Sequence, residues 1–232
     1  MKEKLVSTNP LVIVFDVNET LSDMSPMAGH FAEVGAPATL GKLWFAALLR
    51  DGFALTAAGD NGTFAEIGAE VLRGLLAGID LNRDVGQAVE HIMSGMASLG
   101  LHSDVPDAVR GLRQAGYRLI TLTNGSATVA EKLFERSGIR GEFEALLSVE
   151  NAQAWKPAPA SYGYAAQAIG AAPSEMLLIA VHPWDIHGAA KAGLQTAWIN
   201  RVGAPYPGYF TPPDHTVNGL TELPAVLADR KT

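Results

Sequence analysis

The sequence predicts an α/β protein with a doubly wound parallel sheet and an inserted all-helical segment. Two observations support this. Strand-like apolar runs alternate with helical runs over residues 108–199, whereas residues 21–99 show helical spacing without a strand-like run. Such alternation is typical of parallel sheets covered by helices on both faces. The 232 residues, 48% of them hydrophobic, are enough to bury a core of this size.

The sheet is expected to begin at residues 11–15, a β-branched and aromatic run that suits a strand buried on both faces. Further strands are expected at residues 117–122, 145–149, 176–181 and 196–199, and helices at residues 108–115, 127–137, 160–169 and 186–192. Gly138 is a suitable residue for ending the second of these helices. Past Asn200, a Gly- and Pro-rich stretch predicts a surface loop before a short terminal helix.

The helical insert is predicted from three segments, KLWFAALL, FAEIGAEVLRGLLAG and AVEHIMSGMASL, which carry apolar residues at helical spacing. Because it follows the first strand directly, we expect it to cover the carboxyl edge of the sheet, where open α/β folds bind ligands. The expected domains are therefore a core of residues 1–22 and 100–232 and a helical cap of residues 23–99.

The composition excludes several classes of function. The net charge is -7 and the 17 Lys and Arg residues form no run, so no nucleic-acid partner is expected. The 232 residues include no Cys, which excludes disulfides, thiolate zinc sites and cysteine nucleophiles. The apolar run LVIVF is too short for a signal peptide, and no segment is long enough to span a membrane. We therefore expect a soluble, cytoplasmic protein.

Four polar clusters fall at or just after the ends of expected strands. They are DVNET (16–20), TNGS (123–126), WKP (155–157) and HPWD (182–185). Because the carboxyl ends of parallel strands meet at one edge of a sheet, we expect these clusters to converge. A carboxylate, a hydroxyl with an amide, an ammonium group and a second carboxylate would then share one site.

This convergence predicts covalent hydrolytic chemistry. Asp16 is the expected nucleophile, and Lys156 would keep it ionised, because a nearby opposite charge favours the charged form of a carboxylate. The side chains at 123 and 124 would donate hydrogen bonds to a substrate oxyanion. Asp185 would orient or deprotonate the water that hydrolyses an ester on Asp16, with His182 as a candidate helper.

Each of these residues also has a structural interpretation. A lone Asp after a strand is more often a helix N-cap, and a Lys before Pro is more often a solvated loop residue. We prefer the functional interpretation because the four clusters occur together. Leu49, Phe64 and Tyr162 suit a core position as well as a pocket position. His182, Asp185 and His187 match no common zinc spacing, so no metal is expected there.

The motifs FDVNETL, LTNGS, AWKPAPASY and AVHPWDIHGAAKAGLQTAWINR resemble those of the haloacid dehalogenase superfamily in order and spacing, over nearly the whole chain. The chain is most similar to the L-2-haloacid dehalogenase branch. The resemblance implies a Rossmann-like core and a helical cap. It also implies hydrolysis of short 2-haloacids, small-molecule substrates, to 2-hydroxyacids through an ester on Asp16, with no cofactor or metal. Members are often dimers, so a homodimer is a further expectation.

Carried over by motif, the polar site positions of this branch are Thr123, Asn124, Lys156, Tyr162 and Asp185, and the apolar pocket positions are Leu49, Phe64 and Trp184. The chain departs from the branch on the side of the leaving halide. Phe45 replaces the arginine that follows an LW pair, and Asn18 replaces an aromatic residue. Ala180 and His182 replace Ser and Asn. We count Asn18, Phe45 and His182 as substrate-binding positions, and the halide partner stays open among Asn18, His182 and Arg50.

Two alternatives remain at this point. A Mg²⁺-dependent phosphatase on the same fold is disfavoured by Asn18, because phosphatases of the superfamily place an acidic residue there and an amide cannot donate the catalytic proton. A non-catalytic homologue that binds a small carboxylate is permitted by the loss of the halide-side arginine. Retention of both Asp16 and Lys156 argues against such a binder.

Overall fold

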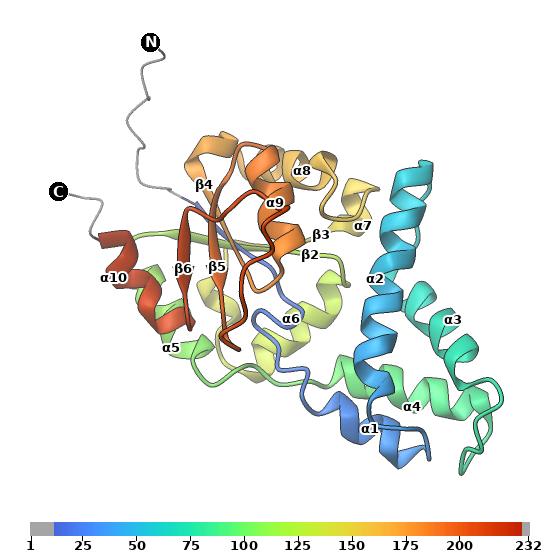
Figure 1. Ribbon diagram of the computed structural model, residues 1–232. Helices are drawn as coiled ribbons and strands as arrows, with labels where there is room; N and C mark the ends of the chain where they lie inside the picture. Colours follow the sequence, from blue (N-terminus) through green and yellow to red (C-terminus); the bar gives the residue numbers. More distant parts are fainter. Residues whose placement is uncertain (1–11, 229–232) are drawn as a thin grey trace.

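The computed structural model describes residues 12–228 and confirms the predicted α/β class (Figure 1). Its six-stranded sheet has the order β3-β2-β1-β4-β5-β6, and all pairings are parallel. The strands are β1 (Val12–Phe15), β2 (Arg118–Thr123), β3 (Ala145–Ser148), β4 (Met176–Ala180), β5 (Gln195–Ile199) and β6 (His215–Val217). Strand order reverses between β1 and β4, the point at which open α/β sheets bind ligands. Leu11, expected to open the first strand, lies outside the described residues.

Helices cover both faces of the sheet. Val12 and Val14 belong to one buried cluster, whereas Ile13 and Phe15 belong to another, so alternate residues of β1 face opposite layers. The Ile13 face is covered by α5 (Val105–Gln114), α6 (Ala127–Arg136) and α10 (Leu223–Ala228). The Val12 face is covered by α7 (Val149–Ala152), α8 (Pro159–Ile169) and α9 (Pro183–Lys191). The doubly wound arrangement follows from this division.

Residues 23–99 form helices and no strand, as predicted. The helices are α1 (Met27–Glu33), α2 (Leu40–Ala58), α3 (Phe64–Leu76) and α4 (Val85–Ala97), and we call this group the helical insert. It lies to one side of the sheet in Figure 1. The backbone N–H of Asp23 donates to the Gly100 carbonyl at 2.9 Å, and that of His102 donates to the Leu21 carbonyl at 2.9 Å. This pairing supports the predicted boundary, while the division into two domains stays a prediction.

No helix within residues 12–228 combines the length and the apolar character needed to cross a membrane.

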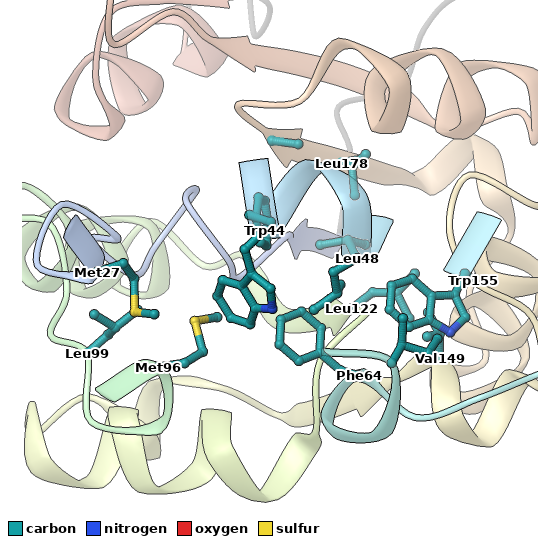
Figure 2. Close-up of a cluster of buried hydrophobic side chains, with 14 of the residues drawn as sticks. Met27, Trp44, Leu48, Phe64, Met96, Leu99, Leu122, Val149, Trp155 and Leu178 are labelled. Atoms are coloured by element: carbon teal, nitrogen blue, oxygen red, sulfur yellow. The ribbon is translucent and has the colours of Figure 1, made fainter. Parts of the chain in front are cut away.

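The core of the helical insert is continuous with one face of the sheet. Figure 2 shows Trp44 and Phe64 of the insert beside Trp155, in the same cluster as Leu122 and Leu178 of the sheet. The rings of Phe64 and Trp155 are stacked, with centroids 6.3 Å apart and an interplanar angle of 4°. The indole N–H of Trp155 also donates to the Gly62 carbonyl at 2.9 Å. Trp155 directly precedes Lys156, so the insert is packed against the segment that carries this lysine.

Gly52 in α2 leaves room for that indole, and its replacement makes a testable change. A Cβ at position 52 would lie 2.5 Å from Cε3 of Trp155. We therefore expect Gly52→Ala to lower the free energy of unfolding by about 1–3 kcal/mol through overpacking, despite the higher helix propensity of Ala. Urea unfolding would measure it.

Gly74→Ala in α3 is the matched control. Apart from its chain neighbours and the backbone of its own helix, no described atom lies within 4 Å of a Cβ built there. This variant is expected to gain up to about 1 kcal/mol, because Ala favours the helix over Gly. Equal stability changes in the two variants would contradict the packing role given to Gly52.

Two sequence predictions are corrected by the structure. Residues 202–215 were expected to be loop up to the terminal helix, but β6 begins at His215 and pairs with β5. At three residues, this edge strand is too short to show alternation. The helix expected at 186–192 begins at Pro183. Proline suits the first helical position, because its missing N–H would have no partner there, so Pro183 starts the helix and does not interrupt it.

Candidate active site

A buried ion cluster lies at the carboxyl edge of the sheet. Asp16 follows β1, Asp185 lies in the first turn of α9 after β4, and Lys156 lies between them. The Lys156 Nζ donates to Asp16 Oδ1 at 2.9 Å and to Asp185 Oδ2 at 2.6 Å. All three side chains are almost completely buried. The structure thus brings together three residues that we expected, from the sequence, to meet.

Asp16 is held as a carboxylate by several donors. Burial alone would favour its protonated form, but the charge of Lys156 and hydrogen bonds from His182 and Thr20 hold the pKa of Asp16 well below its ordinary value. The Thr20 hydroxyl donates to Oδ2 at 2.6 Å and accepts from the backbone N–H of Val181 at 3.1 Å. Thr20 was not among the predicted site residues. An ionised, desolvated carboxylate is the form that can act as a nucleophile.

His182 lies between two carboxylates. Its Nδ1 is 3.1 Å from Asp16 Oδ2, and its Nε2 is 2.8 Å from Glu19 Oε2. Burial alone would favour the neutral ring, but the hydrogen bonds and charges of Asp16 and Glu19 raise the pKa of His182 to about 9. Trp184 stacks on the ring at a centroid distance of 4.9 Å. His182 is therefore an imidazolium at neutral pH, in contact with the proposed nucleophile.

Tyr162 acts on Asp185. Its hydroxyl donates to Asp185 Oδ1 at 2.5 Å, and the side chain is fully buried. Burial raises the pKa of Asp185 even though the charge of Lys156 opposes this. Burial and the Asp185 charge also raise the pKa of Tyr162 well above its ordinary value, which keeps the phenol protonated as a donor. The resemblance implied a polar site position for Tyr162, and the structure places it against the second carboxylate.

Asn124 holds the main chain of Lys156. Its Oδ1 accepts from the Lys156 backbone N–H at 2.9 Å, and its Nδ2 donates to the Lys156 carbonyl at 3.2 Å. The Thr123 hydroxyl accepts from the backbone N–H of Gly125 at 2.9 Å. Both residues were expected to donate to a substrate oxyanion. In the structure, the amide of Asn124 positions Lys156, and the donation to substrate stays a prediction.

A cavity of about 1050 Å³ opens beside this cluster, and its lining is mostly apolar. Phe45, Leu49, His182 and Glu19 line it. The rings of Phe45 and His182 are 6.2 Å apart between centroids. Asp16 is not among the described residues that line the cavity, and His182, which lines the cavity and contacts Asp16, links the two.

Four residues predicted to bind substrate lie elsewhere. Of the described residues that line the cavity, none is Asn18, Phe64, Tyr162 or Trp184. Phe64 packs in the core against Trp155, and Trp184 stacks on the His182 ring. The side chain of Asn18 lies against Gly125, where a Cβ would be 3.3 Å from its Nδ2. The pocket position of Phe64 was implied by the family resemblance, whereas the core position suited it equally well and is the one that it occupies.

Three kinds of comparison agree on what this chain is similar to. A family model described as a haloacid dehalogenase-like hydrolase matches residues 11–193. Haloacetate dehalogenase H-2 of Moraxella sp. (strain B) is 32% identical over 93% of this chain and 97% of that protein. (S)-2-haloacid dehalogenase 4A of Burkholderia cepacia is 31% identical over 94% of this chain and 95% of that protein. A crystal structure of a dehalogenase with an intermediate complex has a TM-score of 0.88 and 30% identity, and the match covers 95% of this chain and 98% of that chain.

Proposed function

The chain belongs to the haloacid dehalogenase-like hydrolase family, in its L-2-haloacid dehalogenase branch, and from this premise we propose that it hydrolyses short 2-haloacids to 2-hydroxyacids. The overall reaction consumes one water and releases one halide ion and one proton. The observation that carries the proposal is the ionised Asp16, which is buried against Lys156 at 2.9 Å and against an imidazolium at 3.1 Å.

In the first half-reaction, an oxygen of Asp16 attacks C2 of the substrate from the side opposite the halogen. The C2–O bond forms while the carbon–halogen bond breaks, and the halide leaves with the bonding electrons, so the configuration at C2 inverts. Lys156 keeps Asp16 ionised before attack. When Asp16 becomes a neutral ester, Asp185 still balances the charge of Lys156, to which it is bonded at 2.6 Å.

In the second half-reaction, water attacks the carbonyl carbon of the Asp16 ester. We assign Asp185 as the base that takes the proton of this water, because burial raises its pKa above the ordinary value and so makes it a stronger base. The hydrogen bond from Tyr162 fixes the orientation of Asp185. The bond between the carbonyl carbon and the C2 oxygen then breaks, this oxygen takes the proton from Asp185, and loss of the second water proton to solvent returns Asp16 to its carboxylate form.

The departing halide needs positive charge nearby, and we assign this role to the imidazolium of His182 acting through space, because both of its N–H groups are bonded to Asp16 and Glu19. The branch places an arginine where this chain has Phe45, and a phenyl ring offers only a weak electrostatic contact. His182 lines the cavity beside Phe45 and carries a positive charge at neutral pH. A charge at the point where negative charge develops stabilises the transition state.

This assignment predicts a loss of activity at high pH. Because the protonated form of His182 is required and its pKa in the free protein is raised to about 9, kcat/KM is expected to fall as pH rises through about 9. His182→Asn should lower kcat at pH 7 and remove this alkaline limb. A profile of the unsubstituted protein that stays flat to pH 10 would rule out the role.

The stability of the protein should also fall as pH rises. A raised folded-state pKa stabilises the protein fully below the unfolded value of 6.5, and this contribution is lost as pH rises through about 9. The loss is on the order of 3 kcal/mol, since each pKa unit corresponds to about 1.4 kcal/mol. Urea unfolding at pH 6 and pH 10, compared between the protein and His182→Asn, measures it.

The function is tested by halide release from chloro-, bromo- and fluoroacetate and from both enantiomers of 2-chloropropionate, with EDTA present. We expect release that is insensitive to EDTA and confined to one enantiomer. No halide from any substrate, together with Mg²⁺-stimulated phosphate release from phosphate esters, would favour a phosphatase. No observation on the described residues favours either the phosphatase or the non-catalytic binder.

A cytoplasmic location and a homodimer belong to the same proposal. The absence of Cys from the 232 residues fits a reducing compartment. Size-exclusion chromatography with light scattering tests the homodimer.

A further inference from the structure

A second cluster of ligand-type side chains lies in the helical insert, outside the site of Asp16. His30 and Glu33 are three residues apart on α1, so they share one face of the helix, and His91 on α4 faces them. The coordinating atoms of the three side chains all lie within 4.8 Å of one another. Helix packing thus brings together two imidazoles and one carboxylate that nothing in the proposed reaction uses.

The geometry holds these side chains in place without an ion. His91 Nε2 is 2.7 Å from Glu33 Oε2. His30 Nδ1 lies 3.4 Å from the same oxygen, yet this buried nitrogen forms no hydrogen bond among residues 12–228. Gly95 on α4 leaves the space for its ring, since a Cβ there would be 2.5 Å from His30 Cδ2. A buried ring nitrogen without a hydrogen bond, aimed at a carboxylate, is suited to a metal ligand.

The main chain around Glu33 is also fixed. Its carbonyl accepts hydrogen bonds from Asn82 Nδ2 at 2.9 Å and from Arg83 Nη2 at 3.0 Å. The Glu33 side chain is 58% exposed, and this exposure gives an ion a path to the site from solvent.

The set of donors selects the class of ion. Two imidazole nitrogens and one carboxylate oxygen form a ligand set found in zinc sites, where water takes the fourth tetrahedral position. Mg²⁺ and Ca²⁺ prefer oxygen ligands and are poorly suited to two imidazoles. The present distances of 2.7 and 3.4 Å between ligand atoms require only small side-chain shifts to surround a zinc ion.

We propose that His30, Glu33 and His91 form a binding site for a divalent cation of the zinc type, which ties α1 to α4. The same helix α1 contributes Met27 and Ala28 to the wall of the cavity beside His182. A bound ion therefore fixes one wall of the substrate cavity through the helix that carries two of the ligands. The proposal is independent of the dehalogenation chemistry.

The test is calorimetric titration of ZnCl2 into the full chain, freed of affinity tag and stripped with EDTA. We expect one zinc ion per chain and a rise in Tm of about 5 °C at saturating zinc. MgCl2 should give neither signal. Because binding and Tm are measured without substrate, a failed activity assay does not affect the result.

Two variants and a control locate the site. His91→Gln and Glu33→Gln are each expected to weaken zinc binding at least about tenfold and to abolish the rise in Tm. Glu90→Gln, at an exposed carboxylate on α4 beside His91 in sequence, should bind like the unsubstituted protein. Circular dichroism confirms that the variants fold. No zinc binding by the unsubstituted protein, or binding that both ligand variants retain, would overturn the proposal.

Discussion

Asp16→Asn is expected to lower kcat for halide release by on the order of 10⁴-fold or more. An amide oxygen is a poor nucleophile, and no other carboxylate contacts Lys156 except Asp185 among the described residues. The fold should survive, because Asn retains the size of the side chain and can still accept a hydrogen bond from Thr20. Halide release measured with an ion-selective electrode checks the prediction.

Asp60→Asn is the matched control, because Asp60 is an exposed carboxylate in the loop before α3. Its kcat should stay within about twofold of the unsubstituted protein. If Asp16→Asn retained more than a tenth of the activity while Asp60→Asn was unchanged, Asp16 would not be the nucleophile.

Lys156→Met is expected to lose both activity and stability. The ammonium group is fully buried and bonded to two carboxylates, so its removal leaves Asp16 and Asp185 without a buried counter-charge. Breaking a buried pair in this way costs about 3–5 kcal/mol. For a chain of this size, that loss corresponds to a fall in Tm of roughly 6–20 °C. The pKa of Asp16 should rise as well, so any residual activity should require higher pH.

A double variant separates charge from packing. Lys156→Met combined with Asp185→Asn removes one of the two unpaired carboxylates and should recover part of the lost stability without recovering activity. Lys132→Met, at an exposed position of α6, should change stability by no more than about 0.5 kcal/mol. Equal losses in the single and double variants would show that the cost comes from packing alone.

The sheet and the charged centre of the site were predictable from the sequence. Strands such as β1 and β4 are continuous apolar runs because both of their faces are buried, and that pattern is visible in one sequence. Once the strands are placed, parallel pairing requires Asp16 and the segment that begins at His182 to meet at one edge. The WKP motif that contains Lys156 allowed this lysine to be placed at the same edge.

The rest of the site depends on contacts that composition and spacing do not encode. Asn124 binds the main chain of Lys156. Nearly every residue type offers the same main-chain groups, so the sequence does not reveal such a partner. Glu19 faces His182 from a turn in which its own φ is 62°, an unusual value for a residue other than glycine. The meeting of His91 with Glu33 depends on how α1 packs on α4. A sequence pattern predicts each helix but not this pairing.

The central claim, that Asp16 attacks C2 and forms an ester, is tested most directly by turnover in H2¹⁸O. Water is proposed to attack the carbonyl carbon of the ester, so one labelled oxygen stays in the Asp16 carboxylate after each cycle. We predict that the peptide containing Asp16 gains mass after many turnovers, and that the product of the first turnover carries unlabelled oxygen. Unlabelled Asp16, together with ¹⁸O in the first product formed, would contradict the claim, because water would then have displaced the halide directly.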